Sequence, residues 1–278
     1  MIKVGAEREI RFDWALRDKR QSAKMMGTFD YDIGNYALRE FEFAIGKKKV
    51  YGNVNFNIFI DDYCNADCKF CVAQLRYEHK NVMYNKCHIQ DADHYLARLE
   101  EVLKIARALD TSVSITGGEP TMSPLLTDVL KLVDAYGFRK RTITTNGSGL
   151  FRIQENDTIL NNLIKYHWDH LNISRVSEND ALNRRIMFAL DQEYCSMDMI
   201  REALKIANHS ALKHRISCLL LKESVCSVEG VKRYMDFYGN IGANNFIFRE
   251  LMDYDKRAVN IEKMKYCDAN KVRLYDIW

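Results

Sequence analysis

The run Cys64-Asn65-Ala66-Asp67-Cys68-Lys69-Phe70-Cys71 places three cysteines within eight residues, in the spacing C-x3-C-x2-C. Thiols so close together on one segment suit a metal ion or an iron–sulfur cluster better than disulfides. Three thiolates also leave one iron of a four-iron cubane without a protein ligand, and an open iron can bind a small molecule. The spacing therefore points to chemistry as well as to electron storage.

The composition of the chain is that of an ordinary globular protein. Of its 278 residues, 47% are apolar and 28% are charged. The net charge of +3 is too small to indicate a nucleic-acid partner, and the basic runs Lys47–Lys49 and Arg139–Arg141 are interpreted as solvated turns. No apolar run is long enough to span a membrane, and Met1–Arg8 contains no apolar signal region. We therefore expect a cytoplasmic protein without a membrane partner.

The chain has 8 cysteines in all. Those outside the quoted run are scattered, and in a cytosolic chain such residues are most often small buried hydrophobes or incidental thiols. They are Cys87, Cys195, Cys218, Cys226 and Cys267.

From residue 55 onward, short β-rich runs alternate with longer segments of helical periodicity, which is typical of a parallel α/β fold. The runs predicted to be strands are Asn55–Asp61, Ser112–Thr116, Arg141–Thr145, His170–Ser174, Arg215–Leu221 and Asn245–Glu250.

Helices are predicted between these strands. Apolar residues recur at helical spacing over Asp93–Leu109, which predicts one buried face. The next helix is expected to begin at Ser123-Pro124, because serine caps free N–H groups and proline suits the first helical position, and to end at Gly137. Further helices are predicted at Thr158–Tyr166, Asp180–Ala189, Met197–His209 and Val228–Tyr238.

Six strands alternating with helices predict a partial (β/α)6 TIM-like barrel of parallel strands rather than a closed barrel of eight. In such barrels the chemistry lies at the carboxyl ends of the strands. The cysteine run directly follows the first strand, so we expect it at that end. We divide the chain into an N-terminal extension that packs on the barrel, the barrel itself and a short C-terminal tail, at residues 1–50, 51–255 and 256–278.

The final run, Lys271–Trp278, alternates polar and apolar residues in a strand-like pattern. Chain termini are usually polar and frayed. We hypothesise that this tail docks on the barrel or on a partner, or that the polypeptide is shortened.

The motif Gly117-Gly118-Glu119-Pro120 follows the second predicted strand. Together with C-x3-C-x2-C after the first strand, it resembles the radical S-adenosylmethionine (radical SAM) enzymes, over about residues 55–252. The resemblance implies that Cys64, Cys68 and Cys71 hold a [4Fe–4S] cluster whose fourth iron binds the amino and carboxylate groups of S-adenosyl-L-methionine. Cluster-driven cleavage would give a 5′-deoxyadenosyl radical that takes hydrogen from a substrate C–H bond.

The resemblance also assigns roles near the first two strands. Phe70 would lie near the adenine, or pack under the loop. Gly117 and Gly118 would let backbone carbonyls approach the methionyl ammonium, with assistance from Glu119.

Roles for the later strand ends follow in the same way. Asn146 would orient the cofactor or substrate, or form a simple Asn-Gly turn. Ser174 would touch the ribose, while Arg175 would bind the methionyl carboxylate or pair with a surface acid. Leu219 would meet the adenine through backbone groups, or belong to the core.

The run Phe248–Met252 resembles the sixth-strand end of the molybdopterin-precursor GTP cyclase branch, where Arg249 and Glu250 would face substrate. That branch carries further cysteines for auxiliary clusters and a C-terminal double glycine. Here only Cys267 follows the barrel, and one thiol cannot hold a cluster. We therefore expect neither that cyclase nor a peptide-modifying enzyme with a multi-cysteine extension.

Two other classes of function are considered. One is a structural zinc protein with His79 or Cys87 as fourth ligand. The other is an iron–sulfur protein for electron transfer or sensing, without catalysis. Neither accounts for the GGEP motif, so we favour an oxygen-sensitive radical SAM enzyme.

The expected partners are a small-molecule or peptide substrate, with a small metabolite slightly favoured, and an electron donor such as flavodoxin or ferredoxin. The sequence identifies no catalytic acid–base pair.

Overall fold

The computed structural model describes residues 38–43, 46–51, 54–75, 89–188, 194–252 and 260–277. The chain divides into two units between Val54 and Asn55. In the first unit, β1 (Leu38–Phe43) and β2 (Gly46–Tyr51) form an antiparallel hairpin. Glutamates face lysines across it, so the basic run Lys47–Lys49 belongs to an exposed strand and not to the turn expected from the sequence. The packing of residues 1–50 on the barrel stays a prediction.

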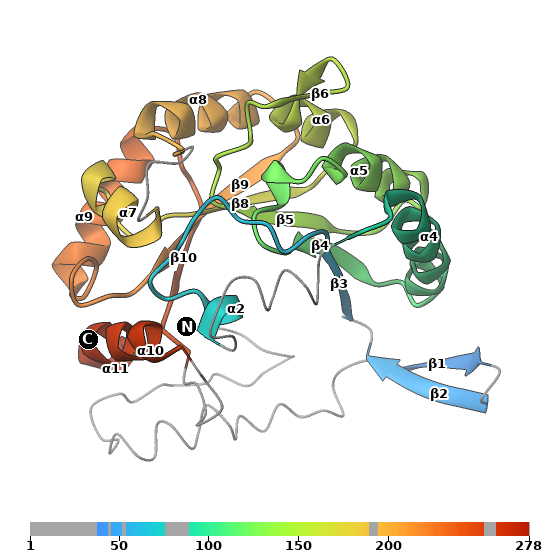
Figure 1. The fold of residues 1–278 in the computed structure, drawn as a ribbon, viewed down its shortest axis with the longest axis horizontal. Coiled ribbons are helices and arrows are strands. Elements are labelled where there is room, and N and C mark those ends of the chain that lie inside the picture. Colours follow the sequence, from blue (N-terminus) through green and yellow to red (C-terminus); the bar gives the residue numbers. More distant parts are fainter. Residues whose placement is uncertain are drawn as a thin grey trace, which may run out of the picture. The chain divides into compact units, whose positions relative to one another are not determined.

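The second unit is built on a parallel sheet of six strands in the order β10-β9-β8-β5-β4-β3 (Figure 1). Every neighbouring pair in this sheet is parallel. The predicted partial barrel of parallel strands is confirmed. The strands are β3 (Asn55–Phe59), β4 (Ser112–Thr116), β5 (Arg141–Thr145), β8 (His170–Ser174), β9 (Lys213–Leu219) and β10 (Phe246–Arg249).

Helices connect these strands and lie in an arc along one side of the sheet (Figure 1). The long ones are α4 (Ala92–Ala108), α5 (Leu126–Ala135), α6 (Ile159–Lys165), α7 (Asp180–Met187), α8 (Met197–Asn208) and α9 (Val228–Asn240). Shorter or later ones are α2 (Val72–Leu75), η3 (Pro120–Met122), α10 (Ile261–Asn270) and α11 (Leu274–Ile277). No helix among the described residues is long and apolar enough to cross a membrane.

Polar side chains cap the helix starts. The Asp91, Ser196 and Ser227 side chains accept the N–H of the residue three positions on, which satisfies a donor that the helix leaves free. Helix α5 begins at Leu126, later than predicted, because a turn over Ser123–Leu125 precedes it. Gly137 follows α5 with φ of 58°, as expected for a residue that ends a helix.

A short antiparallel pair, β6 (Ile153–Gln154) and β7 (Asp157–Thr158), was not predicted from the sequence. Its turn residues Glu155 and Asn156 have φ of 53° and 66°, the backbone geometry of a tight hairpin. Two-residue strands carry too little alternation to be recognised in a sequence.

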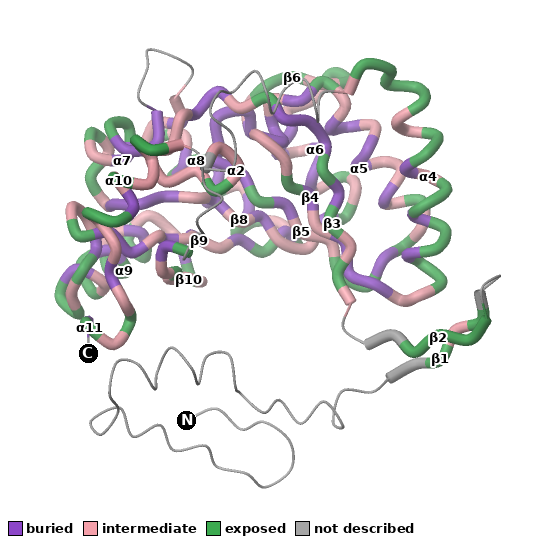
Figure 2. Tube along the Cα trace, turned by 60° about the horizontal axis from the view of Figure 1, so that its bottom comes forward, coloured by how far each residue is buried: buried purple, intermediate pink, exposed green. Residues whose placement is uncertain are grey.

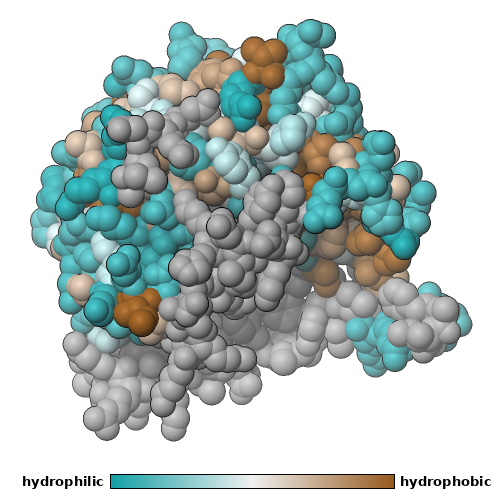
Figure 3. All heavy atoms as spheres, viewed as in Figure 1, coloured by the Kyte–Doolittle hydropathy of each residue, from teal (hydrophilic) through white to brown (hydrophobic). Residues whose placement is uncertain are grey.

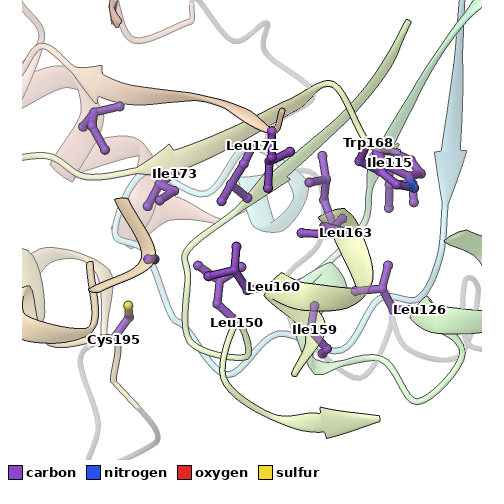
Figure 4. Packing of buried hydrophobic residues seen from close by; sticks show 14 of the residues in the cluster. Ile115, Leu126, Leu150, Ile159, Leu160, Leu163, Trp168, Leu171, Ile173 and Cys195 are labelled. Carbon is purple, nitrogen blue, oxygen red and sulfur yellow. The ribbon is translucent and has the colours of Figure 1, made fainter. Parts of the chain in front are cut away.

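The apolar core lies between the sheet and the helices. Strand residues such as Ile115, Leu171 and Ile173 are fully buried and belong to one cluster with helix residues such as Leu126 and Leu163 (Figure 4). Burial follows the strands and the inner faces of the helices, while the outer face of α4 is exposed (Figure 2). Most of the coloured surface in Figure 3 is hydrophilic.

The C-terminal segment docks on the barrel. Lys271 forms a single antiparallel bridge with Leu221, and the Lys222 N–H donates to the Asn270 carbonyl at 3.0 Å. Val272 and Ile277 are buried in the main core. The docking hypothesis is confirmed, but the strand-like reading of the tail is wrong, because α11 follows the one bridging residue.

The glycines after β4 bring two backbone segments into contact. The Gly118 N–H donates to the Asp61 carbonyl at 2.8 Å, and the Glu119 N–H donates to the Tyr63 carbonyl at 2.7 Å. A Cβ on Gly118 would lie 2.1 Å from the Tyr63 oxygen, and one on Gly117 would lie 2.5 Å from the Asp61 oxygen. Only glycine permits this approach.

We expect Gly118→Ala to lower the free energy of unfolding by about 2 kcal/mol, because its methyl group overlaps backbone that cannot move independently. Urea unfolding measures the change. Gly239→Ala is the control: Gly239 is exposed on α9 with nothing within 4 Å of the added atom, so stability should stay equal or rise. Equal stability of Gly118→Ala and wild type would contradict the contact.

His214 is a buried titratable group on β9, 3% exposed. Burial lowers the pKa of its imidazole, and a backbone hydrogen bond at Gly242 only partly opposes this. The unfolded chain therefore binds the proton more readily than the folded protein does.

Since histidine in an unfolded chain titrates at about pH 6.5, the free energy of unfolding should fall as the pH drops through that value. We expect His214→Gln to lose less stability than wild type between about pH 7.5 and about pH 5.5, because glutamine stays neutral. Chemical unfolding at both pH values provides the comparison. His94→Gln, at an exposed position on α4, should keep the wild-type pH slope, and a wild-type slope in His214→Gln would refute the assignment.

Candidate active site

The three-cysteine run forms a loop at the carboxyl end of β3, where the sequence predicted it. Cys64, Cys68 and Cys71 are half-buried and form no disulfide among the described residues. The Cys71 N–H donates to the Cys68 carbonyl at 3.0 Å, so the last two cysteines share a tight turn that leads into α2. The donors required for a metal cluster therefore lie together on one short segment.

Helix α7 anchors the cysteine loop. The Asp67 N–H donates to the Met187 carbonyl at 2.9 Å, and the Lys69 N–H donates to the Ile186 carbonyl at 3.1 Å. Ala66 is buried in a second apolar cluster that includes Ile186 and Met187. These contacts fix the loop at a place about 120 residues away in sequence, so the pattern of cysteines alone could not reveal them.

Helix α10 holds the same loop from another segment. The Lys263 ammonium, 12% exposed, donates to the Cys68 carbonyl at 2.5 Å and to Asp67 Oδ1 at 3.2 Å. The Lys69 ammonium lies 5.5 Å from the centre of the Tyr266 ring. Sequence reasoning missed Lys263, because a lysine 195 residues beyond Cys68 gives no local signal.

The electrostatics of the loop fit a bound cationic cluster. Burial raises the pKa of the Cys68 thiol well above its usual value, and nearby Cys71 and Cys64 raise it further, whereas Lys263 lowers it. A buried thiol becomes a ligand only when a cation compensates the thiolate charge. Three coupled thiols on one anchored loop therefore fit an iron–sulfur cluster.

The zinc alternative requires a fourth ligand from His79 or Cys87, and both lie outside the described residues. Within the described residues, no three histidine, cysteine or acidic side chains are grouped so that they could hold a single metal ion.

The Glu119 side chain is buried at the start of η3, just after β4, and is 3% exposed. Its Oε1 accepts the Thr121 N–H at 3.0 Å and the hydroxyls of Thr121 and Thr145. Its Oε2 accepts the Asn146 N–H at 2.6 Å. Burial raises the pKa of this carboxyl, against the lowering effect of these hydrogen bonds. Both oxygens are thus engaged in joining the end of β4 to the end of β5.

Asn146 connects this carboxylate to the cysteine loop. Its Nδ2 donates to Asn65 Oδ1 at 3.0 Å, and its Oδ1 accepts the Ser148 N–H at 2.9 Å. The second bond forms the Asn-Gly turn considered from the sequence, and Gly147 adopts φ of 90°. The first bond was not predicted, because Asn65 is 81 residues away.

Arg175 is fully buried at the end of β8. Its guanidinium donates to the carbonyls of Asn146 at 2.7 Å, Ser174 at 2.9 Å and Cys195 at 2.9 Å. Its Nε has no partner among the described residues. Pairing with a surface acid, one of the two interpretations from the sequence, is therefore wrong.

The other predicted site residues lie around the same loop. Phe70 and Leu219 are half-buried and pack against the second apolar cluster, together with Cys64 and Cys68. Ser174 is half-buried at the end of β8. Glu250 pairs with Arg273 at 2.9 Å and accepts the Leu274 N–H, so it holds the C-terminal tail. Arg249 is exposed.

The cysteines outside the loop differ in their surroundings. Cys195, Cys218 and Cys267 are buried, as expected for small hydrophobes, and Cys226 is exposed. Cys87 lies outside the described residues.

Curated relatives of this chain match part of its length. It is 27% identical over 135 residues to an S-adenosylmethionine-dependent nucleotide dehydratase of Flammeovirga pacifica, which covers 49% of this chain and 42% of that protein. It is 29% identical over 97 residues to a probable GTP 3′,8-cyclase of Saccharolobus islandicus, covering 34% and 27% respectively. The chain thus spans less than half the length of these relatives.

Solved structures share the fold. Streptococcus suis SuiB bound to S-adenosylmethionine superposes with a TM-score of 0.54 and 19% identity, covering 90% of this chain and 48% of that one. Native anSMEcpe with bound AdoMet gives a TM-score of 0.50 and 16% identity, over 72% and 52%. At these identities the likeness shows the fold alone.

The sequence profile of the Radical SAM superfamily matches residues 58–233, more than half of the chain. This match spans the end of β3, the cysteine loop, the double glycine and the strands β4, β5, β8 and β9. The chain belongs to the radical SAM superfamily.

Proposed function

We propose that Cys64, Cys68 and Cys71 hold a [4Fe–4S] cluster and that the chain uses it to act on an organic substrate through S-adenosylmethionine. The observation that carries this proposal is the anchored loop of three half-buried cysteines beside the Gly117-Gly118 backbone. When bound, the cluster would supply the electron that cleaves S-adenosylmethionine to methionine and a 5′-deoxyadenosyl radical, which takes hydrogen from the substrate.

The residues around the loop would orient and shelter the cofactors. Phe70 and Leu219, on the apolar cluster beside the cysteines, would flank the adenine. Ser174, half-buried at the end of β8, would reach the ribose with its hydroxyl. Carbonyls of Gly117 and Gly118 would accept from the methionyl ammonium, since neither residue has a side chain in the way.

Glu119 and Arg175 would act as positioning residues. Both Glu119 oxygens are already bonded, and the Arg175 guanidinium is fully buried among carbonyl groups. Each would therefore influence the cofactor through Asn146, whose N–H and carbonyl they bind from two sides.

For the substrate, we favour a small molecule over a peptide. The curated relatives are named for reactions of nucleotides, whereas SuiB has also been crystallised with its precursor peptide. The relatives share more sequence identity with this chain than SuiB does. The proposal further includes a cytoplasmic location and a small redox protein such as flavodoxin or ferredoxin as electron donor.

We expect the anaerobically reconstituted protein to form 5′-deoxyadenosine from S-adenosylmethionine and dithionite, and Cys68→Ala to form none, because the cluster would lose one of its three ligands. Product analysis together with iron and sulfide content provides the test.

Cys226→Ala is the matched control, because that cysteine is exposed and outside the loop. It should keep both the iron content and the product yield. A full cluster without any 5′-deoxyadenosine, with or without candidate substrates, would instead support an electron carrier or sensor. Equal iron content in Cys68→Ala and wild type would contradict the ligand assignment.

A further inference from the structure

The sheet has a second face, directed away from the buried core, and it is polar. Side chains alternate along a strand, and residues paired in a parallel register share a face. Ile143, Leu171 and Ile216 lie on the core face and are fully buried. The alternate positions carry mostly hydroxyl, amide and basic side chains. One row holds Asn57, Ser114, Thr142, His170 and Lys213, and the next holds Thr116, Thr144, Asn172 and Arg215, with the apolar Phe59 at its β3 end.

This polar face is positively charged. The charge comes from Lys213 and Arg215 on β9 and from Arg249 on β10. His170 on β8 lies beside them, and burial and the neighbouring cations lower the pKa of its imidazole, so it adds a polar but neutral ring. Within the described strands, no aspartate or glutamate occupies a position on this face. Glu250, next to Arg249, is already neutralised by Arg273. The face therefore favours an anionic ligand.

Arg215 is held ready for such a ligand. It is half-buried, and its Nε donates to Asn245 Oδ1 at 3.2 Å. Its two terminal nitrogens have no hydrogen-bond acceptor among the described residues. The bond to Asn245 thus orients the Arg215 guanidinium, while its terminal N–H groups stay available for bidentate hydrogen bonds with an oxyanion.

Neighbouring groups would complete the recognition of a polar molecule. Asn172 pairs with Arg215 in the register, and its buried Oδ1 has no hydrogen-bond partner. The same holds for the Nδ1 of His170, one row below. Acceptors of this kind suit the hydroxyl groups of a substrate.

Arg215 lies at a suitable distance from the cysteine loop at the carboxyl ends of the strands. Leu219, beside the cysteine loop, lies four residues beyond Arg215 on the same strand and face. At about 3.3 Å per residue, the two positions are about 13 Å apart. An anionic group at Arg215 would therefore leave the rest of a small molecule pointing toward the cysteines.

We propose that this face binds a phosphorylated small molecule, with Arg215 holding the phosphate and Arg249 contributing charge nearer the carboxyl ends of the strands. The proposal rests on the proposed function and narrows its substrate class. A phosphate matches this face better than a carboxylate does, because its oxygens can accept from the Arg215 guanidinium and from the hydroxyl of Ser217, two residues further along β9 on the same face.

Calorimetric titration of the loaded enzyme under anaerobic conditions tests this, with ribose 5-phosphate, ribose, inorganic pyrophosphate and succinate as probes. We expect ribose 5-phosphate and pyrophosphate to bind and ribose and succinate to bind far more weakly. Arg215→Gln should weaken ribose 5-phosphate binding by about 10- to 100-fold, the usual effect of removing hydrogen bonds to a charged group. Arg215→Lys should keep only part of the wild-type affinity for ribose 5-phosphate, because lysine lacks the two-pronged donor geometry of arginine.

Two further variants keep the result interpretable. Arg201→Gln, which removes an exposed arginine on α8, should bind like wild type. Arg249→Gln changes an exposed side chain and should fold normally while binding more weakly than wild type, whatever happens to the fold of Arg215→Gln.

Several outcomes would overturn the proposal: no binding of either phosphate probe to wild type, equal affinity for ribose and ribose 5-phosphate, equal or tighter binding of succinate, or wild-type affinity in both Arg215→Gln and Arg249→Gln. Because binding is read without turnover, its failure is distinguishable from failure of S-adenosylmethionine cleavage, which is scored separately as 5′-deoxyadenosine.

Discussion

The buried carboxylate of Glu119 joins the ends of β4 and β5, and the geometry of the cysteine loop depends on it through Asn146. Its side chain accepts four hydrogen bonds from Thr121, Thr145 and Asn146, while its own N–H bonds to the Tyr63 carbonyl just before Cys64. A charge in this position is costly unless every lone pair has a donor. The donors come from β4 and β5 and the turns that follow them, so the carboxylate is stable only when those strand ends are correctly placed.

Two further residues connect this carboxylate to the cysteine loop. Asn146 lies between the negative Glu119 and the positive Arg175, and its amide holds Asn65 inside the loop. On the other side, Lys263 of α10 holds the Cys68 carbonyl. The thiols are thus placed by two independent supports, as pre-organisation of a reactive site requires. The glycines complete the arrangement because any side chain at Gly118 would push β4 away from the chain that leads to Cys64.

The sequence predicted the strands well, but it did not predict the hydrogen bonds that hold the cysteine loop in place. The bounds of β4, β5 and β8 match the predicted runs, because short β-rich segments between amphipathic helices leave few alternatives. The predicted placement of the cysteine run after the first strand and of the GGEP motif after the second agrees with the structure, where backbone hydrogen bonds join the two segments. The direction of the Glu119 side chain, the Asn65–Asn146 bond and the Lys263 contact depend on tertiary packing between distant segments, which no local pattern encodes. The start of α5 was predicted too early, and the tail was predicted as a strand where the structure has the short helix α11. Both errors lie where turns compete with regular structure.

Amide hydrogen exchange over residues 61–71, in wild type and in Glu119→Gln, measures whether the Glu119 carboxylate orders the cysteine loop. Glutamine keeps the shape of the side chain but places an NH2 group against N–H and hydroxyl donors. We expect faster exchange throughout the cysteine loop of Glu119→Gln, because the Asn146–Asn65 hydrogen bond depends on the turn that Glu119 holds. The surface variant Glu202→Gln on α8 should exchange like wild type there. Unchanged exchange over residues 61–71, with any increase confined to residues 119–121, would contradict the claim that this carboxylate holds the loop in place.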